Sequence, residues 1–238
     1  MRIVVAVVLL LASACRRDPP PPPPPIQAPP PVAAVAPRLT VGLPGARLVC
    51  ELPVHGQLIS QSKVEITTEV RGERRRFRAE RVEPKDPWTL EPWPDQPAGA
   101  AELELRSGEG PIELSFAGLS FVWPIEFAVD AFGGEVPRAE LRRDGGLRDV
   151  MVVIRGPVYA LDVPPVAELV GPGQTRTAGE DDAEPPWIEV GYAHDEEAWT
   201  QRHYRIERDG KVVLVTAQAP TDAAAAYLEL AHAIAERS

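Results

Sequence analysis

The chain lacks the short motifs that mark most enzyme active sites. Its 238 residues contain no P-loop, GxGxxG, HExxH, G-x-S-x-G or CxxC pattern. Only four histidines and two cysteines are present. The chain therefore lacks the common sequence signatures of nucleotide-binding enzymes, zinc peptidases, serine hydrolases and thiol oxidoreductases. We therefore expect a protein that is not an enzyme and that uses no cofactor and no metal.

Basic residues are outnumbered by acidic ones. The formal net charge is −10, which argues against a nucleic-acid partner because phosphate binding needs a basic surface. Hydrophobic residues make up 44% of the chain and charged residues 25%, a composition typical of globular proteins. Residues 39–238 are numerous enough to form one large domain or two small ones around a buried core.

No apolar run reaches the roughly 20 residues that a membrane-spanning helix needs. The longest, Ile3–Ala14, follows the single charge of Arg2 and ends in small residues. This arrangement is typical of the apolar region of a secretory signal peptide. We predict that residues 1–14 are a signal peptide and not part of the fold.

A cysteine directly follows these small residues. The stretch Ala12-Ser13-Ala14-Cys15 resembles the bacterial lipoprotein signal, although that family usually carries Leu where Ala12 stands. The resemblance implies cleavage before Cys15, acylation of its thiol and new amino group, and a periplasm-facing lipid anchor. Arg16 in place of an aspartate implies the outer membrane under the sorting rule of that family. The alternative is an ordinary secretory signal that happens to contain a cysteine.

Residues 15–38 form a proline-rich linker. The prolines favour polyproline II, a stiff helix without internal hydrogen bonds, and they occur at Pro19–Pro25, Pro29–Pro31 and Pro37. About 23 such residues would reach on the order of 70 Å from a membrane. We interpret the segment as a spacer, with a ligand for polyproline-binding modules as the alternative.

Residues 39–132 have the pattern of antiparallel strands. KVEITTEV and RRRFRAERV alternate in polarity around Gly72-Glu73, which predicts a hairpin, and AELELRS, PIELSFAGLSF and PIEFAVDAF alternate in the same way. Arginines and glutamates are interleaved in the hairpin, which favours an exposed strand that resists edge pairing over an anion site. Cys50 lies in the strand-like ARLVCELPV, where we expect a buried, inert thiol in preference to a reactive one.

Residues 133–238 are predicted to contain strands followed by a terminal helix. Turns are expected at Asp144-Gly145-Gly146 and at Asp209-Gly210, each between two strands. VPPVAELVGPG is at most a short helix, and GEDDAEPP is a solvated loop. The last helix has Thr221 as a candidate cap. We expect its apolar stripe to pack on a sheet; the stripe contains Tyr227, Leu230, Ala231 and Ile234.

The order of the last elements resembles a known family. RHYRIERDGKVVLVTAQAP followed by a helix ending in AIAERS is similar to the close of PsbP-like and DcrB-like domains, over about residues 187–238. The resemblance implies an α/β sandwich, and many proteins of this kind are extracytoplasmic lipoproteins without enzymatic activity. It identifies no site residues.

The overall prediction is an α+β fold, with a β-rich N-terminal half followed by an antiparallel sheet carrying a packed C-terminal helix. The segments 39–132 and 133–238 either fold apart or share one core. Gly133-Gly134 and Pro137 interrupt both patterns, which favours a boundary between them.

Two groups of residues are candidates for function. Trp88 and Trp93 stand in a proline-rich loop, where they form either a platform for a protein or peptidoglycan partner or a cap folded onto the sheet. His194, Asp195 and His203 would serve a tethered hydrolase or a metal-dependent enzyme, although their spacing matches no known ligand pattern and a charged loop is the simpler interpretation. The favoured function is a non-enzymatic envelope lipoprotein whose globular part binds a partner.

Overall fold

The globular part of the chain is an α+β fold, as predicted. The computed structural model describes residues 38–70, 73–83, 86, 88–92, 102–105, 111–143, 145–147 and 149–237. These residues belong to one compact unit, Val35–Ser238. Within them, antiparallel strands form two sheets and a C-terminal helix packs on the larger sheet. No helix in the described ranges is long and apolar enough to cross a membrane.

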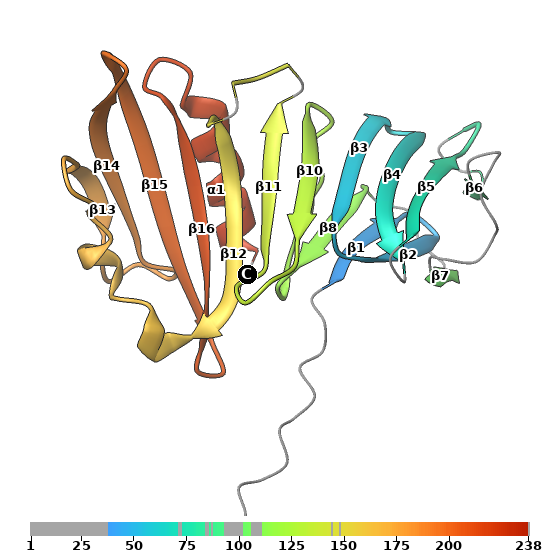
Figure 1. Ribbon diagram of the computed structural model, residues 1–238, viewed down its shortest axis with the longest axis horizontal. Coiled ribbons are helices and arrows are strands. Elements are labelled where there is room, and N and C mark those ends of the chain that lie inside the picture. Colours follow the sequence, from blue (N-terminus) through green and yellow to red (C-terminus); the bar gives the residue numbers. More distant parts are fainter. Residues whose placement is uncertain are drawn as a thin grey trace, which may run out of the picture. The chain divides into compact units, whose positions relative to one another are not determined.

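The smaller sheet has five strands among the described residues, in the order β7-β2-β1-β8-β9 (Figure 1). Buried and partly exposed side chains alternate along β1 and β2, as expected for strands with one face on a core. Cys50 lies on the buried face, as expected, and burial raises the pKa of its thiol to about 12, which disfavours the reactive thiolate. The strands are β1 (Arg38–Leu43), β2 (Ala46–Glu51), β7 (Glu102–Leu105), β8 (Glu113–Phe116) and β9 (Leu119–Val122).

The larger sheet, counted over the same ranges, has eleven strands in the order β13-β14-β15-β16-β12-β11-β10-β3-β4-β5-β6 (Figure 1). After β12 the chain leaves the middle of the sheet, starts again at the far edge with β13 and returns inward to β16. Its strands are β3 (Val54–Ser60), β4 (Lys63–Val70), β5 (Glu73–Glu80), β6 (Thr89–Pro92), β10 (Phe127–Phe132), β11 (Arg138–Arg143), β12 (Met151–Tyr159), β13 (Thr175–Glu180), β14 (Trp187–His194), β15 (Glu197–Arg208) and β16 (Lys211–Pro220).

The connection from β12 to β13 has to cross the sheet. It contains two 3-10 helices, η1 (Ala160–Asp162) and η2 (Val166–Glu168). Val166 and Leu169 pack against Ile188 and Val190 of β14 and hold η2 on the sheet. The prediction of at most a short helix in this segment is confirmed.

One face of the larger sheet forms the core. Buried residues of neighbouring strands lie opposite one another on it, as with Val129, Leu141 and Val152. The helix α1 (Ala225–Glu236) covers β12, β15 and β16 on this face (Figure 1). It also contacts β9 of the smaller sheet. The opposite face of the larger sheet is called the outer face below.

The terminal helix buries the predicted stripe. Its four members are among the buried residues of α1, together with Ala235, which confirms the prediction: Tyr227, Leu230, Ala231 and Ile234. The predicted cap is wrong, because α1 begins at Ala225 and its N-cap is Ala224. Thr221 lies in the turn after β16 and is held beside β15, since its backbone N–H donates to the Ala198 carbonyl and its hydroxyl is hydrogen-bonded to that of Thr200.

A buried tryptophan joins the two sheets. Trp123 follows β9, is 1% exposed, and donates its indole N–H to the carbonyl of Phe127 at 2.7 Å. Its ring lies against Gly56 of β3, where a Cβ would come within 2.9 Å of the ring and 3.0 Å of Val129. Only glycine leaves room for the indole at this position.

The segments 39–132 and 133–238 contribute to one sheet and one core. β10 and β11 pair along their length, from Phe127 opposite Arg143 to Phe132 opposite Arg138. The ring of Phe127 meets that of Tyr227 edge-on at 5.4 Å. Independent folding of residues 133–238 stays a prediction.

The predicted hairpins are present. β4 pairs with β5, β11 with β12, and β15 with β16 around Asp209-Gly210. The arginine-rich strand is exposed at Arg74 and Arg76, as expected, and β6 pairs with β5 only from Phe77 to Glu80. The strand β13 has no apolar alternation in TRTAGE and was not predicted.

Candidate ligand-binding site

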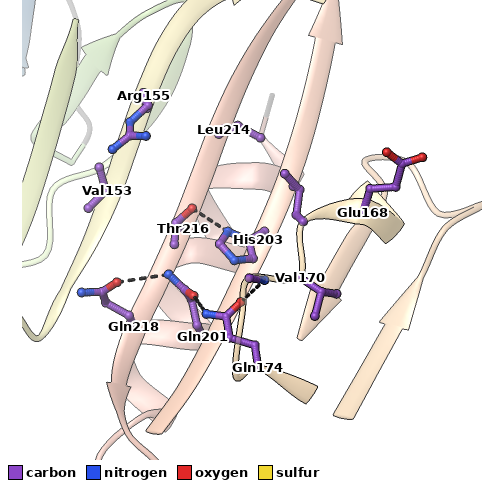
Figure 2. A pocket seen from close by; sticks show the side chains of 12 residues that line it. Val153, Arg155, Glu168, Val170, Gln174, Gln201, His203, Leu214, Thr216 and Gln218 are labelled. Atoms are coloured by element: carbon purple, nitrogen blue, oxygen red, sulfur yellow. Dashed lines mark hydrogen bonds between the residues drawn. The ribbon is translucent and has the colours of Figure 1, made fainter. Parts of the chain in front are cut away.

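A hollow of about 430 Å³ lies on the outer face of the larger sheet (Figure 2). Its floor is formed by β12, β15 and β16, and one wall by η2 and the loop that follows it. The hollow exists because the crossing connection holds this wall above the sheet. Its lining residues are Val153, Arg155, Glu168, Leu169, Val170, Gly171, Gln174, Gln201, His203, Leu214, Thr216 and Gln218.

Three glutamines connect the wall to the floor by a continuous chain of hydrogen bonds (Figure 2). The Gly171 backbone N–H donates to Gln174 Oε1 at 2.7 Å, and Gln174 Nε2 donates to Gln201 Oε1 at 2.8 Å. Gln201 Nε2 donates to Gln218 Oε1 at 3.1 Å, and Gln218 Nε2 donates to the Asp149 carbonyl at 2.7 Å. Each amide is thereby fixed in orientation, and among the described residues one N–H of each amide makes no hydrogen bond.

His203 lies in the middle of the floor and is neutral at physiological pH. Its Nδ1 is 2.9 Å from Thr216 Oγ1 on the neighbouring strand. Burial lowers the pKa of His203 from 6.5 to about 4, because the charged form loses its hydration. Within the described residues, Nε2 has no hydrogen-bond partner.

Acidification is expected to remove the stability that depends on neutral His203. The folded-state pKa of about 4 lies below the ordinary 6.5, so at intermediate pH the unfolded chain binds a proton that the folded chain does not. The contribution, about 3 kcal/mol, is present above the unfolded-state pKa and is lost as the pH falls through the folded-state pKa. The free energy of unfolding, measured with urea, should therefore fall more between neutral pH and about pH 4 in wild type than in His203→Gln. The exposed His194→Gln is the control and should follow wild type; equal pH dependence in wild type and His203→Gln would contradict the prediction.

The structure separates the histidine candidates. His194 and Asp195 lie at the exposed turn between β14 and β15, with Nε2 and Oδ2 at 3.7 Å. Glu197 is opposite His194, and His203 lies farther along β15, about 20 Å away at the rise of a strand. In the part of the chain that the structure describes, no group of three His, Cys, Asp or Glu side chains is placed to hold a metal ion. Of the three residues, the hollow contains only His203.

Trp88 packs inward. Its side chain belongs to the core and is 8% exposed, and the Arg81 guanidinium lies 4.7 Å from the centre of its ring. This burial matches the alternative of a cap on the sheet and removes Trp88 from an exposed platform. Trp93 and Cys15 lie outside the described residues.

The glutamines of the hollow were missed by the sequence analysis, although a signal for two of them exists. A two-residue turn at Asp209-Gly210 determines the register of its hairpin, so counting outward places Gln201 opposite Gln218 and His203 opposite Thr216. Gln174 has no such signal, because the loop that carries it reaches the floor only through the crossing connection.

The chain was compared with protein-family models, with curated proteins and with solved structures, and none of them matches. The similarity of residues 187–238 to PsbP-like and DcrB-like domains stays a prediction.

Proposed function

We propose that this protein is a lipid-anchored, non-enzymatic binding module of the bacterial cell envelope, whose hollow binds a cell-wall or protein partner. The glutamine chain is the observation that carries the proposal. Three neutral side chains are held by hydrogen bonds of 2.7–3.1 Å, and they offer amide N–H groups to a ligand without an ordering cost. A volume of about 430 Å³ is in the range of small-molecule sites, about 300–1,000 Å³.

The chemistry of the lining favours recognition over catalysis. Glutamine amides do not ionise near neutral pH, so they do not act as general acids or bases. His203 beside the Thr216 hydroxyl is the arrangement in which a histidine base activates a nucleophile. However, a general base works best when its pKa is near the working pH, and the pKa of His203 is about 4. The alternative of a tethered hydrolase or metal-dependent enzyme loses support because His203 lies far from His194 and Asp195.

The proposed lipid anchor is supported by the sequence alone. Cys15 follows a lipoprotein-like signal, and the prolines after it favour a stiff spacer. Two or more acyl chains are needed for durable attachment, since one chain gives only marginal binding. In this proposal the spacer carries the globular part from the outer membrane into the periplasm, toward the cell wall.

The proposal is tested with the full chain extracted from membranes in detergent. Intact mass should show a mature N-terminus at Cys15 with acyl chains attached. Soluble disaccharide-peptide fragments of peptidoglycan, added in excess, should raise the melting temperature by several degrees, because a ligand that binds only the folded state stabilises it. The masses of the fragments should be unchanged after incubation. Gln201→Leu should lose the shift, whereas Gln57→Leu, on the outer face of β3, should retain it.

Each part of the proposal has its own contrary result. An unmodified Cys15 or a different N-terminus would overturn the lipid anchor. New fragment masses would overturn the non-enzymatic assignment. An unchanged melting temperature in wild type, or an equal shift in Gln201→Leu, would overturn the assignment of the hollow as the site.

A further inference from the structure

One arginine at the hollow has no partner in the described part of the protein. Arg155 is exposed, lies on the outer face of β12 and lines the hollow. Across the described ranges, its guanidinium makes no hydrogen bond, ion pair or ring contact. Its opposite neighbour on β11 is Arg138, another cation. Like charges directly opposite on neighbouring strands are destabilising, so an anion at this position would relieve the repulsion.

Arg138 already has partners of its own. Its Nε lies 2.9 Å from Glu140, and its guanidinium lies 5.0 Å from the centre of the Phe132 ring. Glu140 is also paired with Arg142. The carboxylate of Glu140 is therefore shared by two arginines, and Arg155 is left as the cation open to a ligand.

The one carboxylate of the lining does not neutralise Arg155. Glu168 belongs to η2, on the opposite wall, and in the view of Figure 2 its carboxylate points away from His203. Arg155 instead lies on the side of Val153 and Thr216 (Figure 2). The hollow thus has a positive end in a chain whose net charge is −10.

The rest of the lining matches a peptide backbone. A peptide alternates N–H donors and C=O acceptors, and the lining contains glutamine amides and the imidazole of His203, which can pair with both kinds of group. Aliphatic side chains flank these groups and suit small apolar substituents: Val153, Leu169, Val170 and Leu214. A guanidinium holds a carboxylate by two parallel hydrogen bonds, which the ammonium of lysine does not reproduce.

We propose that the hollow binds the carboxyl terminus of a short peptide, with the terminal carboxylate on Arg155 and the backbone amides on Gln201 and Gln174. This inference rests on the proposed function and names the chemical group that the hollow recognises. It also defines a direction for the bound peptide, since its carboxylate lies at the β12 side and its preceding residues extend toward the η2 wall.

The test measures affinities of the full chain by calorimetry. The probes are N-acetyl-dialanine and N-acetyl-trialanine as L and D forms, each with a free carboxyl terminus and with a terminal amide. We expect a free-acid probe to bind at least about tenfold more tightly than its amide, about 1.4 kcal/mol. Arg155→Gln should abolish the preference for the free acid over the amide. Arg155→Lys should retain only part of that preference. Arg74→Gln, an exposed arginine on β5, should leave it unchanged.

The outcomes separate this inference from the proposed function. If peptidoglycan fragments bind but acids and amides bind equally, or no alanine probe binds, the carboxyl-terminus inference is overturned and the binding module stands. If N-acetylmuramic acid alone binds in an Arg155-dependent manner and the peptides do not, the carboxylate belongs to a sugar acid and the peptide assignment is overturned. Binding of the free-acid peptides with loss in Arg155→Gln supports the inference.

Discussion

Trp123→Ala is expected to lower the free energy of unfolding by about 3–5 kcal/mol. The indole is 1% exposed, and its N–H is bonded to the Phe127 carbonyl at 2.7 Å. Truncation removes the apolar burial, leaves a cavity between the two sheets and leaves that carbonyl without its donor. Urea denaturation followed by circular dichroism measures the change. Tyr159→Ala is the control, because Tyr159 is 70% exposed and its loss should cost less than about 0.5 kcal/mol.

The packing of Trp123 against Gly56 can be tested with a pair of substitutions. In wild type, Gly56→Val should destabilise the protein because a Cβ there comes within 2.9 Å of the indole. In a Trp123→Ala background the same change should cost less, because the side chain enters the space that the ring has left. Residues in direct contact show such non-additivity. Strictly additive effects would show that the indole does not pack on Gly56.

Leu230→Asp is expected to lower the free energy of unfolding by at least about 3 kcal/mol. Leu230 is 8% exposed and lies in the stripe by which α1 packs on the larger sheet. The substitution removes apolar burial and places an unpaired carboxylate in the core. Thermal unfolding should show a large drop in melting temperature that is smaller at low pH, where the new carboxyl group is protonated.

Glu229→Lys is the matched control on the same helix. Glu229 is exposed and adjacent to Leu230 in sequence, so its replacement should change the stability by no more than about 0.5 kcal/mol. A loss as large as that of Leu230→Asp would show that α1 presents a different face to the sheet.

Several features of this protein follow from the sequence because they depend on neighbouring residues. The stripe of α1 follows from a spacing of 3.6 residues, and the β15–β16 register follows from the turn at Asp209-Gly210. Both patterns are local, since each is complete within one helix or one hairpin. The α+β class follows from the same patterns, with alternating runs followed by a single amphipathic helix.

The helix start and the position of Trp88 show where local patterns fail. Thr221 has the side chain of a cap, but its backbone N–H donates to the Ala198 carbonyl of β15, which holds it in a turn, and the helix begins at Ala225. Trp88 stands among prolines, as exposed loop residues do, but Arg81 and the core cover its ring. In both cases a contact made in the folded protein overrides the local preference.

The existence and position of the hollow depend on the tertiary structure and do not follow from local sequence patterns. The order of the sheet places β12 beside β16 while β13 lies at the far edge, and no local pattern encodes that order. The connection between β12 and β13 must therefore cross the sheet, and it does so on the outer face, where Val166 holds it on β14 and Gln174 reaches Gln201. The sequence determined which residues alternate and where the turns lie, because those preferences act over a few residues. The folded core determined which strands are neighbours, because burial of apolar surface depends on all strands together.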